Sequence, residues 1–230
     1  MKSTFISALL IVFGLLTTHA QTTLGLKLGA NLTSIQAKGL EDLDVPALVF
    51  GIQAGAFVQK NLNEKWAIQP ELIYIQKGYE AIEQGIAFNT FIFDADVRLD
   101  YLELDANAKY FLLANSDTDV YLIGGPYVGY AIRGRFTGEQ GLPGLTSDFN
   151  IDLYDDNNGL ENVNLGTNER LDLGVNIGLG GQFDLGKVWF FAEARYSQGL
   201  LNLNGDSSAT ARNYGIYANF GWFIYLNGDK

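Results

Sequence analysis

The stretch YLELDANAKYFLL, residues 101–113, alternates apolar and polar side chains at every second position. Its two faces are Leu102, Leu104, Ala106, Ala108 and Tyr110 on one side, and Glu103, Asp105, Asn107 and Lys109 on the other. A period of two is that of a β-strand, whose successive side chains point to opposite faces of a sheet. The stretch therefore predicts a strand with one apolar face and one strongly polar face.

The same alternation recurs along the chain, for example in TLGLKLGANLTS (23–34), RLDLGVNIGLGGQF (170–183) and KVWFFAEARYS (187–197). It predicts eight strands, at about 23–33, 48–60, 65–79, 96–112, 119–135, 169–183, 187–199 and 212–227. The connections between these strands alternate in length. Long ones fall near 34–47, 80–95, 136–168 and 200–211, and short ones at 61–64, 114–119 and 184–187.

Short turns on one side and long loops on the other are typical of a bacterial outer-membrane barrel. The alternative is a soluble lipocalin-like barrel, whose apolar residues face inward. Hydrophobic residues make up 47% of the chain and charged residues only 18%, so apolar faces turned inward would leave a poorly charged exterior. We therefore expect an all-β fold, an eight-stranded antiparallel transmembrane up-and-down β-barrel, with the apolar faces toward lipid.

With that orientation the polar faces line a narrow lumen, which in an eight-stranded barrel is filled by side chains. The predicted polar network consists of Lys27, Glu71, Glu103, Asp105, Lys109, Glu193 and Arg195. Glu71, Glu103 and Glu193 also suggest a glycosidase-like acid/base set, but such sites need an open cleft. Pairing with lysine and arginine is the interpretation that a filled lumen favours.

The stretch AIQPELIYIQKG, residues 67–78, tests this orientation because it contains both a carboxylate and a proline. Glu71 has the parity of the lumen face, and Pro70 has the parity of the lipid face. Since proline lacks the N–H that a ladder requires, it predicts a bulge or a widened ladder step. Ile73 and Ile75 share the inward parity of Glu71, so either they pack near the outer rim or a bulge at Pro70 shifts the register.

Residues 1–20 predict a cleavable signal peptide, followed by a barrel domain at 21–230. Lys2 precedes an apolar run from about Phe5 to Leu16, and small residues precede Gln21. A retained anchor is the weaker alternative because the run is shorter than the ~20 residues that a spanning helix needs. His19 is the only histidine and the chain has no cysteine, so the mature chain would lack Ser-His and Cys-His nucleophile pairs and His-ligated metal sites.

The segment 138–168 is rich in acids and contains neither lysine nor arginine. Its part YDDNNGLE suggests a calcium site, with Asp152, Asp155, Asp156 and Glu161 as candidate ligands, because carboxylate and amide oxygens suit hard cations. The spacing departs from that of an EF-hand, since Leu165 stands where the last ligand belongs. A solvated acidic loop, or divalent cations bridging it to lipopolysaccharide, is the other interpretation, and no further cofactor is expected.

Several motifs resemble the PorT-like family of outer-membrane β-barrel proteins typical of Bacteroidota. They lie in IQPELIYIQKG (68–78), LDYLELDANAKYF (99–111), VYLIGGPYVGYAI (120–132), DLGVNIGLGGQF (172–183) and FAEARYSQGLLN (191–202). The chain departs from the family pattern at Asp105, where the family usually has proline. The resemblance implies an eight-stranded outer-membrane barrel; the namesake's link to protein secretion would be an analogy at the level of the fold.

These observations predict a non-enzymatic, monomeric protein of the bacterial outer membrane. Its expected partners are outer-membrane lipid and lipopolysaccharide, and its expected role is structural or the binding of a partner or ligand through acidic outer loops. Participation in a secretion or surface-assembly complex, with secretion-complex proteins as partners, and a porin-like small-solute channel are the alternatives. A net charge of −11 argues against nucleic acid.

Overall fold

The computed structural model describes residues 22–38, 47–87, 90–114, 117–142, 145–154, 169–203 and 210–226. The strands in these ranges are β1 (Thr22–Lys38), β2 (Val49–Asn61), β3 (Trp66–Ala87), β4 (Thr90–Ala114), β5 (Thr118–Leu142), β6 (Leu145–Asp152), β7 (Leu171–Asp184), β8 (Trp189–Gly199) and β9 (Thr210–Tyr225). No helix in the described ranges is long and apolar enough to cross a membrane. The predicted signal peptide lies outside the described residues.

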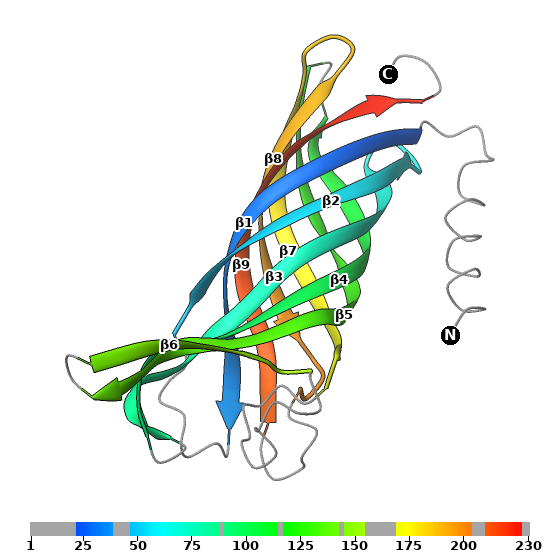
Figure 1. Cartoon of the computed structure of the whole chain (residues 1–230). Coiled ribbons are helices and arrows are strands. Elements are labelled where there is room, and N and C mark those ends of the chain that lie inside the picture. The colour runs from blue at the N-terminus through cyan, green and yellow to red at the C-terminus, as the bar shows by residue number, and fades with distance from the viewer. Residues whose placement is uncertain are drawn as a thin grey trace.

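All strands except β6 form one closed antiparallel ring of eight (Figure 1). Each strand pairs with its neighbour in the chain, β1 pairs with β9, and β5 pairs with both β4 and β7. Thr23 is opposite Tyr225, so the ends of the ring's first and last strands lie together. They lie at the end that carries the three short connections (Figure 1). The predicted fold class is confirmed.

Two of the short connections, between β2 and β3 and between β7 and β8, are tight turns held by side-chain caps. Asn63 Oδ1 accepts hydrogen bonds from the backbone N–H groups of Lys65 and Trp66, both at 2.9 Å. Asp184 Oδ1 accepts one from the N–H of Gly186 at 2.6 Å, and Gly186 has a φ of 93°, which favours glycine. Asn and Asp side chains stabilise turns in this way, so these connections need few residues.

Apolar side chains cover the outside of the ring. Leu26 is 48% exposed and Ile177 63% exposed, whereas Lys27, next to Leu26 on the inward face, is 2% exposed. This distribution is the reverse of that in a soluble barrel, because the charged groups are inside and the apolar groups are outside. Such an exterior is stable only against lipid.

The alternation changes sign toward the end with the long connections. On β4, the inward residues between Tyr101 and the short-connection end include Glu103 and Asp105. Between Tyr101 and the long-connection end the inward residues are apolar, with Val97 and Leu99 both buried. The outward residues change in the opposite sense, from leucines to Asp96, Arg98 and Asp100. We interpret this inversion as the level at which the wall leaves the membrane.

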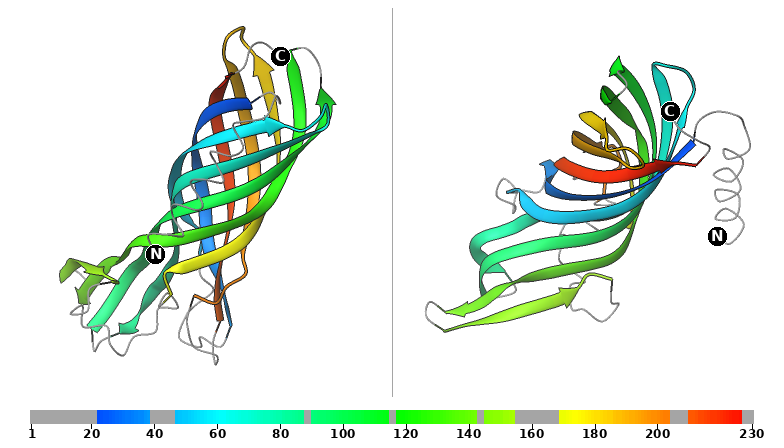
Figure 2. Two further views of the ribbon diagram at one scale, coloured as in Figure 1. Left: turned by 90° about the vertical axis from the view of Figure 1, so that its right-hand side faces the viewer. Right: turned by 90° about the horizontal axis from the view of Figure 1, so that it is seen from above.

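Beyond that level, β3, β4, β5 and β6 continue as a sheet that we call the outer extension. It projects sideways past the ring (Figure 1), and the view along the barrel shows it bending away from the axis (Figure 2). Two predicted loops are therefore wrong in part. Residues 80–95 are mostly strand, because β3 runs to Ala87 and β4 begins at Thr90, and residues 136–168 include the end of β5 and all of β6.

Pro70 lies on the outward face of β3, as its parity predicts, but it causes no bulge. The β2–β3 pairing skips two consecutive pairs, Val58 with Pro70 and Gln59 with Gln69, and then resumes in the same register. These two pairs are those that need an N–H at position 70. On the other side of β3, Pro70 remains paired with Ala106. The missing donor thus opens a short gap in the ladder without moving any side chain to the other face.

Candidate functional site in the barrel lumen

The lumen has three layers of side chains, of which the middle one is charged. Its charged members come from five strands, and all are at most 5% exposed: Lys27, Glu71, Lys77, Glu103, Asp105, Lys109, Asp172, Glu193 and Arg195. Burying so many charges is unfavourable unless they are paired and hydrogen-bonded. The contacts among them therefore decide what this layer can do.

Glu71 on β3 is the most highly coordinated carboxylate of the middle layer. Its Oε2 forms a short ion pair with Lys27 on β1, and its Oε1 accepts from Arg195 on β8 at 2.7 Å. Gln69 and Asn107 each donate to Oε1 as well, both at 2.8 Å. Four donors from four strands thus converge on one carboxylate, which ties together opposite walls of the barrel.

Arg195 connects Glu71 to two further carboxylates. Its Nη2 lies 2.6 Å from Glu193 Oε1, and its Nη1 lies 3.6 Å from Asp105 Oδ2. Glu193 also accepts from Tyr121 and Asn219, at 3.2 and 3.3 Å. Asp105 is the most weakly held of the three, because its Oδ1 has no hydrogen-bond partner within the described ranges.

A second cluster forms around Lys77, nearer the outer end of β3. Lys77 Nζ lies 2.7 Å from Glu103 and 3.0 Å from Asp172, and the ring of Tyr127 lies 4.3 Å from the same nitrogen. Asp172 has the lumen parity that its strand pattern predicts, whereas Lys77 is absent from the predicted network. Parity could have found Lys77, since it lies six residues after Glu71 on one continuous strand.

Lys109 is brought into the same layer without an ion pair. Its Nζ donates to Gln59 at 2.9 Å and to Gln182 at 3.5 Å, and it lies 4.0 Å from the centre of the Tyr121 ring. No carboxylate oxygen of the described residues lies within 4.0 Å of it. Of the predicted network, Lys27, Glu71, Asp105, Glu193 and Arg195 therefore form one cluster, Glu103 belongs to the cluster of Lys77, and Lys109 belongs to neither.

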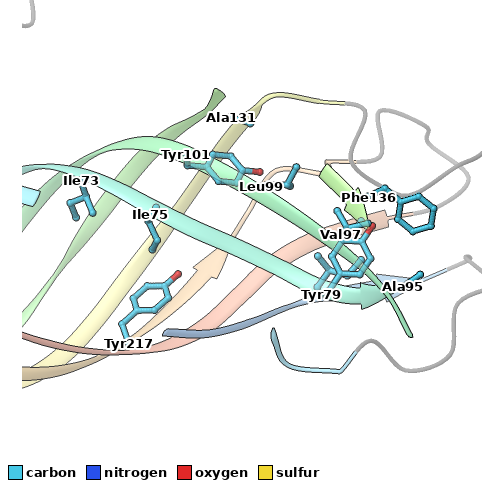
Figure 3. Close-up of a cluster of buried hydrophobic side chains, with 12 residues drawn as sticks. Ile73, Ile75, Tyr79, Ala95, Val97, Leu99, Tyr101, Ala131, Phe136 and Tyr217 are labelled. Carbon is cyan, nitrogen blue, oxygen red and sulfur yellow. The ribbon is translucent and has the colours of Figure 1, made fainter. Parts of the chain in front are cut away.

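Apolar layers lie on both sides of the charged one. Toward the outer end, inward residues of five ring strands form a buried cluster that includes Ile73, Ile75 and Tyr217 (Figure 3). No register shift occurs at Pro70, so Ile73 and Ile75 face inward in this apolar cluster, between Glu71 and Lys77 on β3 and short of the outer rim itself. At the opposite end, Phe57, Trp189, Phe191 and Phe223 form an aromatic cluster in which every ring is at most 3% exposed.

Part of the acidic segment lies in the outer extension. Asp152 ends β6, is exposed, and accepts a hydrogen bond from the N–H of Tyr154 at 2.9 Å. Asp155, Asp156 and Glu161, the other candidate calcium ligands, lie outside the described residues. Within the described ranges no group of three or more acidic, histidine or cysteine side chains is placed to hold a metal ion.

Comparison with solved structures finds similar outer-membrane proteins at low sequence identity. The outer membrane protein OprG from Pseudomonas aeruginosa is 14% identical, with 91% of this chain and 97% of that chain covered and a TM-score of 0.50. The outer membrane protease OmpT from Escherichia coli is 10% identical, with 92% and 100% covered and a TM-score of 0.50. Ail of Yersinia pestis is 12% identical, with 89% and 99% covered and a TM-score of 0.42.

At such identities these likenesses concern the fold alone. No curated protein matches the sequence. A family model described as "Outer membrane protein beta-barrel domain" matches residues 19–205, which is most of the chain. The chain therefore belongs to the family of outer membrane protein beta-barrel domains.

Proposed function

We propose that this protein is a non-enzymatic outer-membrane barrel that binds a partner or ligand at its outer extension. The observation that carries this proposal is the filled lumen, in which a charged layer lies between two apolar layers. Family membership indicates a bacterial outer membrane, so the membrane-embedded wall contacts lipid. On the side of the long connections, the surface available for recognition outside the membrane is then that of the outer extension.

Charge on the outer extension supports a contact with a basic partner or with cation-bridged lipopolysaccharide. Glu139 near the end of β5 and Asp148 on β6 are opposite each other and both exposed. Like charges directly opposite each other destabilise a strand pair, so the pair favours a ligand that supplies positive charge. The ring closes without a second chain, which favours a monomer as the functional unit.

The residue inventory supports the non-enzymatic part of the proposal. After residue 20 the chain has neither histidine nor cysteine. The carboxylates that resemble an acid/base set, Glu71, Glu103 and Glu193, are paired with cations and are at most 5% exposed. A substrate would therefore have to displace an apolar layer to reach them.

Partner binding is tested by site-specific photo-crosslinking in native outer membranes. A crosslinking residue replaces Asp148 on the outer extension, and a matched one replaces Glu64, which is exposed in the turn at the opposite end. We expect a discrete crosslinked product from position 148 and none of the same mass from position 64. Equal products from both positions, or none from position 148, would overturn the proposed binding surface.

A small-solute channel is the alternative function that the polar strand faces suggest from sequence. Apolar layers on both sides of the charges oppose ion passage, because a permeating ion would have to leave water to cross them. We therefore expect no conductance steps when the purified barrel is inserted into planar bilayers. Reproducible conductance steps that are absent without the protein would support the channel function.

The PorT-like resemblance has a structural interpretation in the lumen. Its motifs contribute Glu71 of Q-P-E-L, Glu103 of Y-L-E, Tyr127 of G-P-Y-x-G-Y, and Glu193 and Arg195 of E-A-R-Y, and all of these side chains are buried inside. We therefore propose that the shared motifs maintain the filled lumen. A secretion role is the second candidate, and a deletion strain with an unchanged secretome would rule it out.

A further inference from the structure

The outward face of β4 and β5 changes from apolar to charged within one step of the sheet. Tyr74, Leu102 and Tyr130 are in one cross-strand row, and the next outward row holds Gln76, Asp100 and Arg133. Tyr130 and Ile132 are 46% and 53% exposed, as is typical of lipid contact. Tyrosines mark the membrane–water interface of such barrels. The charged row therefore lies at the height of lipid head groups.

Three arginines occupy this level on two adjacent strands, and we call them the arginine patch: Arg98, Arg133 and Arg135. Arg98 and Arg135 are directly opposite each other. Two like charges in that position repel, so the arrangement requires anions nearby. Each guanidinium carries five N–H donors, which makes the patch a dense set of hydrogen-bond donors.

Carboxylates of the protein use only part of these donors. Arg98 Nη2 lies 3.3 Å from Asp96, and Arg135 Nη2 lies 3.6 Å from Asp100. Arg135 Nε is buried and has no hydrogen-bond partner within the described ranges. Arg133 is exposed, and no carboxylate oxygen of the described residues lies within 4.0 Å of its guanidinium nitrogens.

Further acids border the patch, so its donors, and not an excess of charge, set its preference. Asp152 is opposite Arg135 on β6, and Glu80 is opposite Asp96 on β3. With these acids the region is close to neutral, and long-range attraction of anions is weak. A planar guanidinium instead selects groups that accept two parallel hydrogen bonds, such as phosphate.

The distribution of arginine supports a function at this height. The chain has six arginines, of which only Arg195 lies in the lumen, while Arg98, Arg133, Arg135, Arg170 and Arg212 lie at the outer end. At the opposite end the cations near the turns are lysines: Lys60, Lys65 and Lys187. Arginine is thus concentrated at the outer end, where phosphate groups of outer-leaflet lipid would be met.

We propose that the arginine patch binds the phosphate of a lipid head group in the outer leaflet. The acyl chains of that lipid lie along the apolar wall on the membrane side of the patch, over Leu102, Tyr130 and Ile132. This inference deepens the lipid contact within the proposed function and rests on it. It is independent of the partner bound by the outer extension, so crosslinking at Asp148 and lipid retention at the patch can fail separately.

The test is lipid retention by the folded barrel in detergent, counted by native mass spectrometry. The probes are bis-phosphorylated lipid A, its dephosphorylated form with the same chains, and inorganic phosphate, all with a chelator present. The chelator prevents divalent cations from bridging lipid phosphate to Asp96 or Asp100. Heat-modifiable gel migration confirms that each variant is folded.

Arg133→Gln is the informative variant, because Arg133 forms no ion pair with a carboxylate of the described residues and the change therefore breaks none. We expect it to weaken retention of the phosphorylated lipid about tenfold and to leave the dephosphorylated lipid unchanged. Arg133→Lys keeps the charge but not the planar fork, and should lose part of the affinity. Arg212→Gln, at the outer end of β9, is the matched control and should bind like the wild type.

Three results would overturn the proposal. Equal retention of both lipids by the wild type would mean that the chains alone bind. Unchanged retention in Arg133→Gln would place the phosphate elsewhere. Displacement of the phosphorylated lipid by inorganic phosphate at similar concentration would mean that the patch takes a free anion and not a lipid.

Discussion

Replacing Glu71 by Gln is expected to destabilise the barrel strongly, although the side chain keeps its size. Lys27 has no second carboxylate within 4.0 Å among the described residues, so the change leaves its buried ammonium group uncompensated. Arg195 retains Glu193 at 2.6 Å and Asp105 at 3.6 Å. Removing one partner of a buried pair typically costs about 3–5 kcal/mol, and we expect a loss in that range.

The paired variant Lys27→Met/Glu71→Gln separates charge burial from packing. It removes the uncompensated ammonium group together with its partner, so it should recover about 2 kcal/mol relative to the sum of the single changes. The measurement is urea-induced unfolding from phospholipid vesicles, followed by the fluorescence of buried Trp189. Glu64→Gln in an exposed turn is the control, expected to stay within about 0.5 kcal/mol of the wild type. A loss below about 1 kcal/mol for Glu71→Gln would refute the reasoning.

The same unfolding assay checks changes at Gly174 and Asp105, and amide hydrogen exchange checks one at Pro70. Gly174→Ala should cost about 1–3 kcal/mol, because its Cβ would lie 2.5 Å from a tyrosine ring of β5. Gly181→Ala is the control and should be tolerated, because the nearest atom to its Cβ would be 3.8 Å away. Equal losses of stability in the two variants would argue against this packing. Asp105→Asn should change stability by less than about 1 kcal/mol, because the 3.6 Å contact with Arg195 is its one ion pair in the described part of the chain. Pro70→Ala should slow amide exchange in the neighbouring part of β2 by restoring a ladder donor, and unchanged exchange would show that the gap has another cause.

Much of the ring could be predicted from sequence, because within the membrane the two faces of each strand meet lipid and lumen. That contrast produces the regular alternation of Leu102 and Leu104 with Glu103 and Asp105. The same contrast predicted which charges lie inside. Parity assigns a face but not a height, so it did not tell that Glu103 pairs with Lys77 while Glu71 pairs with Arg195.

The outer extension was missed because alternation there has the opposite sign. Beyond Tyr101 the inward residues are apolar and the outward ones polar, since the outside faces water and the inside closes the mouth. A search that expects apolar side chains outside interprets this reversal as the end of the strand. The apparent exceptions Ile73 and Ile75 belong to the apolar cluster of the outer end, although Lys77, two residues after Ile75 on β3, is a charged inward residue.

The central claim is that the lumen is closed at both ends of its charged layer, and thiol accessibility tests it most directly. The chain contains no cysteine, so single substitutions give an unambiguous signal. Ser197→Cys places a thiol on the inward face of β8 at a position that is 1% exposed, and Asp148→Cys places one on the exposed surface of β6. With the folded barrel in vesicles, a small water-soluble thiol reagent should modify Asp148→Cys rapidly and Ser197→Cys only after unfolding. Modification of Ser197→Cys in the folded barrel at a rate close to that of Asp148→Cys would contradict the account.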